Sequence, residues 1–177
     1  MASTYLTRTP SSNSNRKTFT YSAWIKIGST ATMQLFSAGD STYYTSFRLT
    51  QTGLRATNYD PSTAWNLRTN RLFRDTSAWY HIVLRVDTTQ STASDRIRIY
   101  VNGELQTSLL ENTYPSQNIN DHVNSTELHA IGTTIAVGSN NFDGSMSHIH
   151  LCDGYSYDAS AFGEYDANGV WKIKTSP

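Results

Sequence analysis

Apolar and polar residues alternate with a period of two along several stretches of the chain. In "TFTYSAWIKI", residues 18–27, the odd positions are apolar and the even positions are polar except Trp24. "WYHIVLRVD", residues 79–87, repeats the alternation with apolar residues at even positions. Successive side chains of a β-strand point to opposite faces. Each stretch therefore predicts a strand with one buried face, and we expect the second sheet or a loop to bury Trp24.

A third alternating stretch predicts a β-hairpin. "DRIRIYVNGEL", residues 95–105, alternates Ile97, Ile99 and Val101 with polar positions and then reaches Asn102-Gly103. Asn-Gly favours a type I′ turn, because both central residues of that turn need positive φ. The chain is expected to reverse direction there.

Weaker alternation and turn residues fill most of the remaining chain. Further strands are predicted over 33–38, 46–50, 54–59, 133–138 and 170–174. The polar stretch 111–127 is predicted to be an ordered surface loop. Helix is expected only as a short turn in "DASAFGEY", residues 158–165, with Asp158 as its N-cap. Many short strands separated by Gly and Asn turns indicate an all-β sandwich or barrel.

Composition and charge narrow the function classes. The chain has 177 residues, enough for one domain with a substantial core. Its formal net charge is +0, whereas proteins that neutralise many phosphates carry a basic surplus, so we expect no nucleic-acid partner. Charged residues make up 16%, below the roughly 25% of an ordinary domain. The 11 tyrosines and many threonines favour pleated, half-buried positions.

The single cysteine and the N-terminal stretch bear on the compartment. One cysteine cannot form an internal disulfide, the usual staple of small secreted domains. "MASTYLTRTP" lacks the basic and apolar regions of a secretory signal, and no apolar run approaches the ~18 residues of a membrane span. We therefore expect synthesis in a reducing cytosol and no membrane partner.

Three stretches in one order carry a family resemblance. "FTYSAWIKI", then "WYHIVLRVD" followed by "IRIYVNGEL", then "FDGSMSHIHLCDG" resemble laminin-G-like domains of the concanavalin A-like jelly-roll superfamily. The resemblance extends from about Thr18 to Ile173. It implies a two-sheet antiparallel jelly-roll sandwich over residues 18–177, preceded by an N-terminal arm over residues 1–17.

The two ends of the chain carry a narrower resemblance. "YLTRTPSSNSNRKTFTYSAWIKI" and "DGYSYDASAFGEYDANGVWKIK" look like jelly-roll modules in structural proteins of tailed phages, especially marine ones. This implies a non-enzymatic virion protein, a capsid decoration or a tail or fibre module, assembled in the host cytoplasm. The implied partners are other virion proteins and further copies of the chain. Arg8, Arg16 and Lys17 of the arm would suit an acidic partner surface.

Two other classes stay open beside the virion protein. The first is a carbohydrate-binding module of a cellular or secreted protein, and a displayed virion module could likewise recognise host-surface glycans. The second is a glucan hydrolase, because some glycosidases of the superfamily use Glu-x-Asp-x-x-Glu on one strand. Glu164 and Asp166 match the first two acids, but Gly169 stands where the second glutamate should be. Retaining hydrolysis needs two carboxylates about 5 Å apart, so we expect no catalytic residues.

Histidine and cysteine at alternate positions raise the question of a metal. His148, His150 and Cys152 would share one strand face with Met146, opposite Ile149 and Leu151. Such a face can hold zinc. However, positions four residues apart on a straight strand lie about 13 Å apart at the ~3.3 Å rise per residue. The histidines are therefore expected to be structural, and neither metal nor cofactor is expected.

A calcium site at the rim of the sandwich is a weaker alternative. Calcium prefers carboxylate and carbonyl oxygens, and the rim loops supply Asn140, Asn141, Asp143 and Asp60. Asn and Asp are also ordinary turn residues. No calcium ligand is therefore placed among the expected site residues.

Aromatic residues in two loops indicate a glycan site. A sugar ring presents C–H groups on one face and hydroxyls at its edge, so it suits a flat aromatic side chain beside polar groups. Loops on a rigid sandwich commonly carry binding function. "STYYTS" and "NYDPSTAW" supply such a set, which is the predicted glycan site: Tyr43, Tyr44, Asn58, Tyr59, Asp60 and Trp65.

Overall fold

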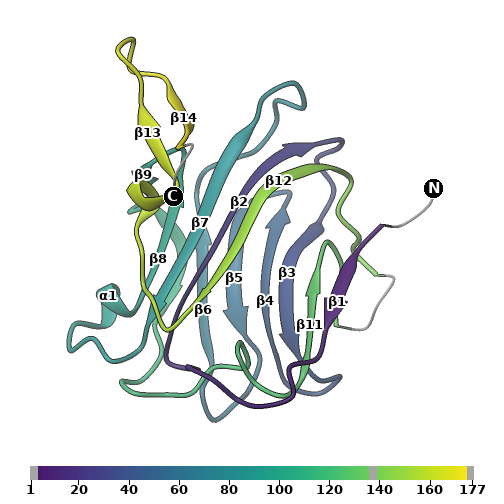
Figure 1. Ribbon diagram of the computed structural model, residues 1–177, viewed down its shortest axis with the longest axis vertical. Helices are drawn as coiled ribbons and strands as arrows, with labels where there is room; N and C mark the ends of the chain where they lie inside the picture. The colour runs from purple at the N-terminus through teal and green to yellow at the C-terminus, as the bar shows by residue number, and fades with distance from the viewer. Residues whose placement is uncertain (1–3, 136–138, 175–177) are drawn as a thin grey trace.

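Two antiparallel β-sheets packed face to face form the body of the computed structural model, which describes residues 4–135 and 139–174 (Figure 1). The protein is all-β, as the alternation predicts. The seven-stranded sheet has the order β1-β11-β3-β4-β5-β6-β10, and the five-stranded sheet has the order β12-β2-β7-β8-β9. A separate hairpin, β13–β14, projects beyond one end of the sandwich (Figure 1).

Each sheet contains strands from distant parts of the chain. In the seven-stranded sheet they are β1 (Leu6–Arg8), β11 (Leu128–Ile131), β3 (Met33–Gly39), β4 (Tyr44–Thr50), β5 (Gly53–Asn58), β6 (Trp65–Thr69) and β10 (Leu109–Thr113). In the five-stranded sheet they are β12 (Gly144–Asp153), β2 (Thr18–Ile27), β7 (Tyr80–Asp87), β8 (Ile97–Val101) and β9 (Glu104–Leu105). The hairpin is β13 (Gly163–Tyr165) and β14 (Trp171–Ile173), and the two helical turns are α1 (Ala93–Arg96) and η1 (Ala159–Ala161).

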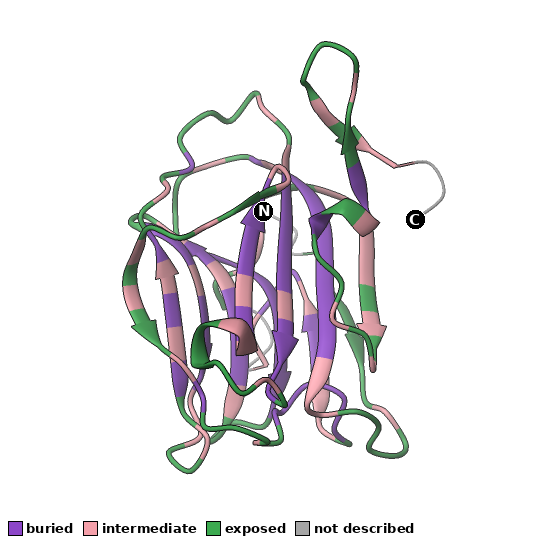
Figure 2. Ribbon diagram, turned by 90° about the vertical axis from the view of Figure 1, so that its left-hand side faces the viewer, coloured by how far each residue is buried: buried purple, intermediate pink, exposed green. Residues whose placement is uncertain are grey.

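The core lies between the two sheets and uses the predicted alternating positions. All five odd residues of β2, from Phe19 to Ile27, are at most 2% exposed. Even residues of β7 and odd residues of β8 join the same cluster, together with Phe47 and Trp65 from the seven-stranded sheet. Figure 2 shows burial concentrated along the strands and exposure along the loops. The predicted core-facing positions of the three strongest strands are confirmed.

The predicted Asn-Gly turn and the predicted N-cap of the short helical turn are both confirmed. Asn102 and Gly103 have φ of 50° and 83°, and they join β8 to β9. Gly103 also lies against the ring of Trp171, where a Cβ atom would come within 2.5 Å of the indole. Asp158 caps η1, because its carboxylate accepts a hydrogen bond from the Ser160 amide at 2.9 Å.

Strands that lack a long alternating run escaped the sequence pattern. β1, β10 and β11 are short and have exposed or irregular burial patterns, and β6 alternates over only five residues. The strand predicted over 133–138 is wrong for residues 133–135, which follow β11 without strand structure, and 136–138 lie outside the described residues. The stretch 111–127 begins inside β10, and its residues 121–125 are buried against the sandwich.

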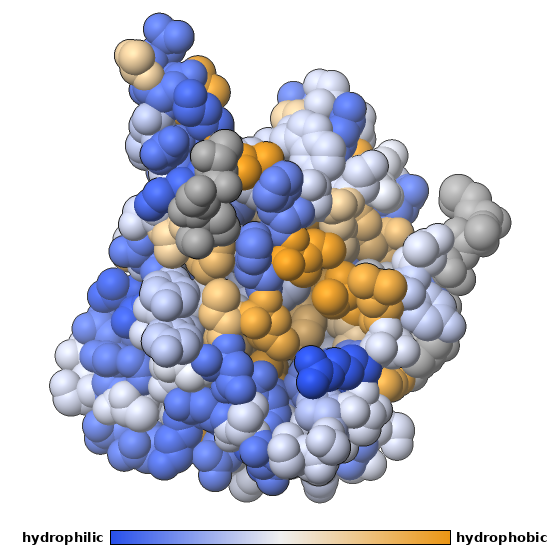
Figure 3. All heavy atoms as spheres, viewed as in Figure 1, coloured by the Kyte–Doolittle hydropathy of each residue, from blue (hydrophilic) through white to orange (hydrophobic). Residues whose placement is uncertain are grey.

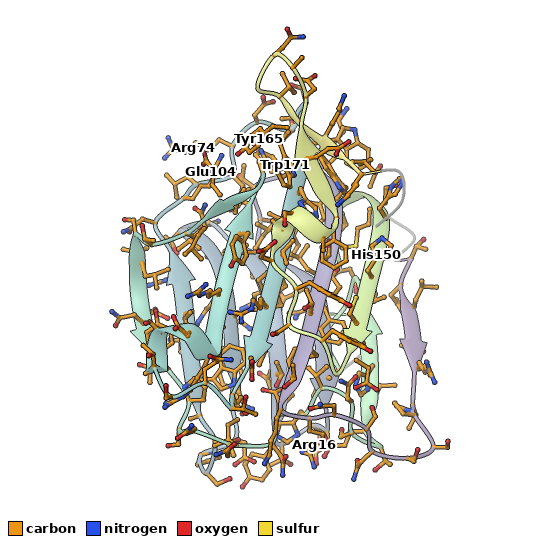
Figure 4. The ribbon with its side chains drawn as sticks, turned by 60° about the vertical axis from the view of Figure 1, so that its left-hand side comes forward. Arg16, Arg74, Glu104, His150, Tyr165 and Trp171 are labelled. Carbon is orange, nitrogen blue, oxygen red and sulfur yellow. The ribbon has the colours of Figure 1, made fainter. Side chains whose placement is uncertain are left out.

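The N-terminal segment packs along the body. β1 pairs with β11 at the edge of the seven-stranded sheet. Further along, Ser14 donates its amide to the Asn124 carbonyl at 2.9 Å. The Arg16 Nε donates to the Asp121 carbonyl at 2.6 Å, at the end of the molecule opposite the projecting hairpin (Figure 4). Residues 6–16 are therefore part of the sandwich surface here, and Arg16 is engaged within the chain.

A C-terminal cover buries the outer face of the five-stranded sheet; it is the segment 154–174. Its Ala159 and Phe162 form a second apolar cluster with Val83 and Tyr100 of that outer face. As a result, Thr20, Ser22 and Trp24 on the outer face of β2 are buried as well, and the expectation of a single buried face is wrong for this strand. Trp24 is 7% exposed, on the outer face, where it borders the cover instead of the second sheet.

Among the described residues, no helix is long and apolar enough to cross a membrane.

Candidate functional site

The six residues of the predicted glycan site come together at one end of the seven-stranded sheet. Tyr43 directly precedes β4, which begins at Tyr44, and β5 ends at Asn58, which Tyr59 and Asp60 follow. Trp65 opens β6 directly opposite Asn58. The two loops that the sequence singled out are thus neighbours in space.

Asn58 and Trp65 face the core and support this end from inside. Both are buried, at 2% and 1% exposure. Their side-chain N–H groups donate to the carboxylate of Asp121, at 3.3 Å from Asn58 and 3.1 Å from Trp65. The predicted stacking role of Trp65 is wrong for this arrangement, since both its faces are enclosed. Asp121 is the residue that sequence reasoning missed here, hidden in the long polar stretch.

Asp121 organises the loops from a fully buried position. Its carboxylate also accepts from the Thr45 hydroxyl at 2.6 Å and from the Val123 amide at 3.0 Å. A buried carboxylate is stable only where hydrogen bonds replace its lost water. The side chains of β4, β5 and β6 converge on this group, so it holds the three strand ends in one geometry.

Tyr44 and Tyr59 form an aromatic pair on the outer side of the same strands. Their ring centroids lie 4.7 Å apart with an interplanar angle of 37°. The Tyr59 amide donates to the Tyr44 carbonyl at 2.9 Å, which fixes the two backbones together. Both residues are half-buried, whereas Tyr43 beside them is 41% exposed.

Three arginines continue this outer surface along the sheet. Arg48 lies opposite Arg55 in the β4–β5 ladder, and Arg55 lies opposite Arg68 in the β5–β6 ladder. Arg48 Nη2 donates to the Tyr59 hydroxyl at 2.6 Å, and its guanidinium carbon lies 5.7 Å from the Tyr59 ring centroid. Each arginine occupies an outward position of its own strand, and their adjacency follows from the register between the strands.

A carboxylate from the neighbouring strand joins the arginines. Glu111 of β10 pairs with Arg68 at 2.7 Å and with Arg55 at 3.4 Å. It also accepts a hydrogen bond from Asn66 Nδ2. We call this surface the tyrosine–arginine face and define it by seven residues: Tyr44, Arg48, Arg55, Tyr59, Asn66, Arg68 and Glu111.

Beside the tyrosine–arginine face, the rim carries a histidine between two carboxylates. His122 Nδ1 lies 2.7 Å from Glu127 Oε2, and its Nε2 lies 3.6 Å from Asp60 Oδ2. The hydroxyl and amide of Ser62 donate to Asp60 and lower the pKa of that carboxyl. Asp60 is therefore held as an anion at the edge of the site.

A β-bulge separates the histidines of β12. The register with β2 shifts between Ser147 and His150, and His148 has a φ of 48°. Met146 and Ile149 consequently both pack on the core, so the predicted sharing of one face by Met146 and His148 is wrong. His150 and Cys152 contact the cover instead.

Metal and acid–base chemistry find little support in the arrangement. Among residues 4–135 and 139–174, no three His, Cys, Asp or Glu side chains are grouped to hold a metal ion. Asn140 accepts a hydrogen bond from the Gln34 amide near the start of β3, whereas Asp60 follows Tyr59, which bonds to Tyr44 at the other end of β3. The calcium candidates therefore do not converge. Asp166 accepts the Asn168 and Val170 amides within the turn between β13 and β14, which lowers its pKa.

The outer face of the five-stranded sheet holds an aromatic stack under the cover. His81 stacks between Trp24, with centroids 5.0 Å apart, and Trp171, with centroids 5.9 Å apart. The Trp171 indole donates to His81 Nδ1 at 3.1 Å, and Ser22 Oγ lies 2.9 Å from Nε2. Burial, helped by the nearby His150, lowers the pKa of His81 to about 4. Figure 4 shows Trp171 beside Tyr165 at the base of the projecting hairpin.

Comparison with solved structures returns carbohydrate-binding and laminin domains. Domain 4 of an extracellular arabinanase from Geobacillus stearothermophilus, in complex with arabinotriose, aligns with a TM-score of 0.58 at 17% identity. That alignment covers 80% of this chain and 63% of the arabinanase chain. The Ruminococcus gnavus IT-sialidase module CBM40, bound to α2,3-sialyllactose, gives 0.52 at 14% identity and covers 81% and 78%.

A laminin domain pair aligns over more of this chain. Domains LG4-5 of the mouse laminin alpha1 chain give a TM-score of 0.58 at 9% identity, covering 98% of this chain and 43% of the laminin chain. At such identities the likeness concerns the fold. A search of curated proteins found no match. The model of the laminin-G type within the "Concanavalin A-like lectin/glucanases superfamily" matches residues 2–155. The chain therefore belongs to the concanavalin A-like lectin/glucanase superfamily.

Proposed function

We propose that the protein is a non-catalytic carbohydrate-binding domain that contacts glycans through the tyrosine–arginine face. The observation that carries the proposal is the half-buried pair of Tyr44 and Tyr59 beside fixed polar side chains on an outward sheet surface. Aromatic rings provide flat apolar area for the C–H face of a sugar, and the neighbouring Arg48 and Asn66 provide donors for its hydroxyls.

The supporting chemistry is that of binding. Arg48 holds the Tyr59 hydroxyl at 2.6 Å, and Glu111 fixes Arg68 at 2.7 Å, so the polar groups are positioned before a ligand arrives. Preorganised side chains lose less conformational freedom on binding. Glu164 and Asp166, the acids that suggested a hydrolase, lie on the projecting hairpin, and Asp166 is engaged in its turn. The carbohydrate-binding proteins of similar fold agree with a binding role.

A glycan array with the purified protein tests this function. We expect a consistent group of oligosaccharide ligands with affinities in the micromolar to millimolar range. Tyr44→Ala and Tyr59→Ala should each weaken binding by about tenfold, because each removes half of the aromatic pair. Tyr155→Ala is the matched control: Tyr155 is 60% exposed and belongs to the cover on the other sheet.

The outcomes separate a binding domain from a purely architectural one. Thermal unfolding of each variant must stay close to the parent, since only then does a change in binding report on the face. An array without ligands contradicts the function. Equal losses for Tyr155→Ala and Tyr59→Ala would move the site away from the tyrosine–arginine face.

We further propose that the domain is displayed on a virus particle, together with further copies of itself. The support is the resemblance of residues 5–27 and 153–174 to jelly-roll modules of tailed-phage structural proteins. A domain of this kind would recognise host-surface glycans from the capsid or the tail. Mass spectrometry of purified particles tests the location, and absence of the chain from the particles would leave a module of a cellular or secreted protein as the alternative.

A further inference from the structure

We propose that the tyrosine–arginine face selects glycans that carry an acidic group, a carboxylate or a sulfate ester, and that Arg48, Arg55 and Arg68 bind this group. The inference rests on the proposed carbohydrate-binding function and names the class of its ligand.

The three arginines are adjacent across three strands. Arg55 has Arg48 directly opposite on one side and Arg68 directly opposite on the other. Side chains at such positions have Cβ atoms about 4.5–5.5 Å apart, and like charges there are destabilising. The guanidinium group cannot relieve the repulsion by losing its proton. Three arginines in one row therefore need negative charge nearby.

The chain itself supplies only part of that charge. Glu111 pairs with Arg55 and Arg68, at 3.4 Å and 2.7 Å. In the described part of the chain, no other carboxylate lies within ion-pair distance of the three arginines. Three positive charges against one leave two uncompensated on this face. The whole chain has a formal net charge of +0, so the excess is a local concentration.

Arg48 is the arginine with the greatest capacity for a ligand. It donates to two neutral hydroxyls, Tyr59 at 2.6 Å and Ser46 at 3.4 Å. A guanidinium group has five N–H donors in a planar fork, so most of the Arg48 donors have no acceptor within the described structure. This fork fits the two oxygens of a carboxylate or a sulfate, and such charge-assisted pairs are about twice as strong as neutral ones.

The position of Arg48 beside the aromatic pair fixes the type of anion. A sugar ring resting on Tyr44 and Tyr59 would place its ring substituents next to the Arg48 guanidinium. An acid attached directly to the ring, as in a uronic acid, a sialic acid or a sulfated sugar, satisfies both contacts in one residue. Phosphodiester chains are the less favoured anion, because their binding rests on many phosphate contacts and a basic surplus that this chain lacks.

An array that carries each oligosaccharide core in neutral, carboxylated and sulfated form tests the selection. We expect the acidic forms to bind at least about tenfold more tightly than their neutral counterparts. The preference should shrink between about 50 mM and about 500 mM NaCl, because salt screens the interaction. The carboxylated and sulfated arms identify which anion the face prefers.

Charge-removing variants locate the contact. Arg48→Gln and Arg55→Gln should each lower affinity for the best acidic glycan about tenfold. Glu111→Gln should raise that affinity, because it frees Arg55 and Arg68 from their internal partner. Arg74→Gln is the matched control: Arg74 is exposed and lies at the hairpin end of the molecule, and its loss removes the same charge from the chain (Figure 4).

Each result decides for or against the inference. Neutral and acidic glycans binding equally, or Arg48→Gln behaving like Arg74→Gln, would overturn the acidic selection and leave the carbohydrate-binding function standing. A single-stranded oligonucleotide that competes as well as the best acidic glycan would show a general polyanion surface and would also overturn it. An array without any ligand removes the proposed function, and the inference falls with it.

Discussion

The outer faces of the two sheets differ in almost every respect. The tyrosine–arginine face of the seven-stranded sheet is polar and charged, and each of its seven residues is partly exposed. The outer face of the five-stranded sheet carries Trp24, His81 and Val83 and lies under the cover. The family match ends at residue 155, so nearly all of the cover lies beyond the shared sandwich. One fold thus gives two outer surfaces of different chemistry.

A third region, the edge between the sheets, belongs to neither face. Figure 3 shows hydrophobic residues gathered where β12 borders β1. The hollow there is lined by Leu6, Ile131, Ile149 and Leu151, and Leu6 is 64% exposed. Two unequal faces and one apolar edge give the molecule three distinct sides.

The largest expected effect is loss of the buried anchor beneath the tyrosine–arginine face. Asp121→Ala leaves the donors of Thr45, Asn58 and Trp65 without their acceptor in a closed interior. Each such orphaned donor costs about 1–3 kcal/mol, and we expect the free energy of unfolding to fall by about 3–5 kcal/mol. Chemical denaturation measures the change.

An exposed acid provides the control for Asp121. Glu164→Ala removes the same charge from the projecting hairpin and should change stability by less than about 0.5 kcal/mol. Similar losses for both variants would mean that the Asp121 network does not hold the strand ends together.

The next effect concerns the cover. Phe162→Ala removes a ring that is 6% exposed and packs against His81 and His150. A buried Phe→Ala change costs about 3–5 kcal/mol, with the lower end expected where a segment can release locally. Hydrogen exchange should show faster exchange in residues 154–174 and unchanged exchange in β4 and β5. Glycan affinity should stay unchanged, and Val170→Ala, at an exposed site, should affect neither.

The pH dependence of the unfolding free energy tests the covered face alone, through His81. An unfolded histidine has a pKa near 6.5, whereas burial lowers the pKa of folded His81 to about 4. As pH falls, the unfolded chain binds the proton first, so stability is full above about pH 6.5 and is lost as pH falls toward about 4. The loss due to His81 should approach about 3 kcal/mol.

The variant His81→Gln isolates this contribution. It should flatten the dependence of unfolding free energy on pH between about 6.5 and 4 by up to about 1.4 kcal/mol per pH unit. Lowered carboxyl pKa values, as at Asp60 and Asp87, act at still lower pH. An unchanged slope would mean that protons reach the stack without opening the cover.

The smallest expected effect is on the reaction rate of the Cys152 thiol. Burial raises the pKa of the Cys152 thiol, and the residue packs against the cover. Because the thiolate is the reactive form, Cys152 should react with a disulfide reagent at pH 7.5 several times more slowly than free cysteine. Phe162→Ala should accelerate the reaction, whereas Asn66→Ala on the tyrosine–arginine face should not. Equal rates in all three proteins would show that the cover does not protect this thiol.

The sequence pattern predicted the inner faces well because burial leaves a periodic signal. β2 and β7 alternate over ten and eight residues around the core, and the shorter β8 alternates over five. The Asn102-Gly103 turn has its own backbone requirement. The outer faces leave no comparable signal. Which polar positions share a surface depends on register between strands, as with Arg48, Arg55 and Arg68.

The predicted site was found in part for the same reason. Tyr44 and Tyr59 stand in recognisable loops, and their pairing follows once β4 and β5 are neighbours. Trp65 was predicted to contact a glycan, but it is the first residue of the short strand β6 and its side chain points into the core. Asp121 and the bulge at His148 depend on contacts between distant segments or on one extra residue, and neither alters local periodicity.

The cover gives the molecule a front and a back. A sandwich with two equivalent outer faces could expose either of them to solvent. Attachment to another protein through one face could then cover the face that binds the ligand. Here residues 154–174 cover the outer face of the five-stranded sheet, so the two outer faces of the domain are not equivalent. A larger assembly that contacts the domain through the covered face would leave the tyrosine–arginine face of every copy exposed.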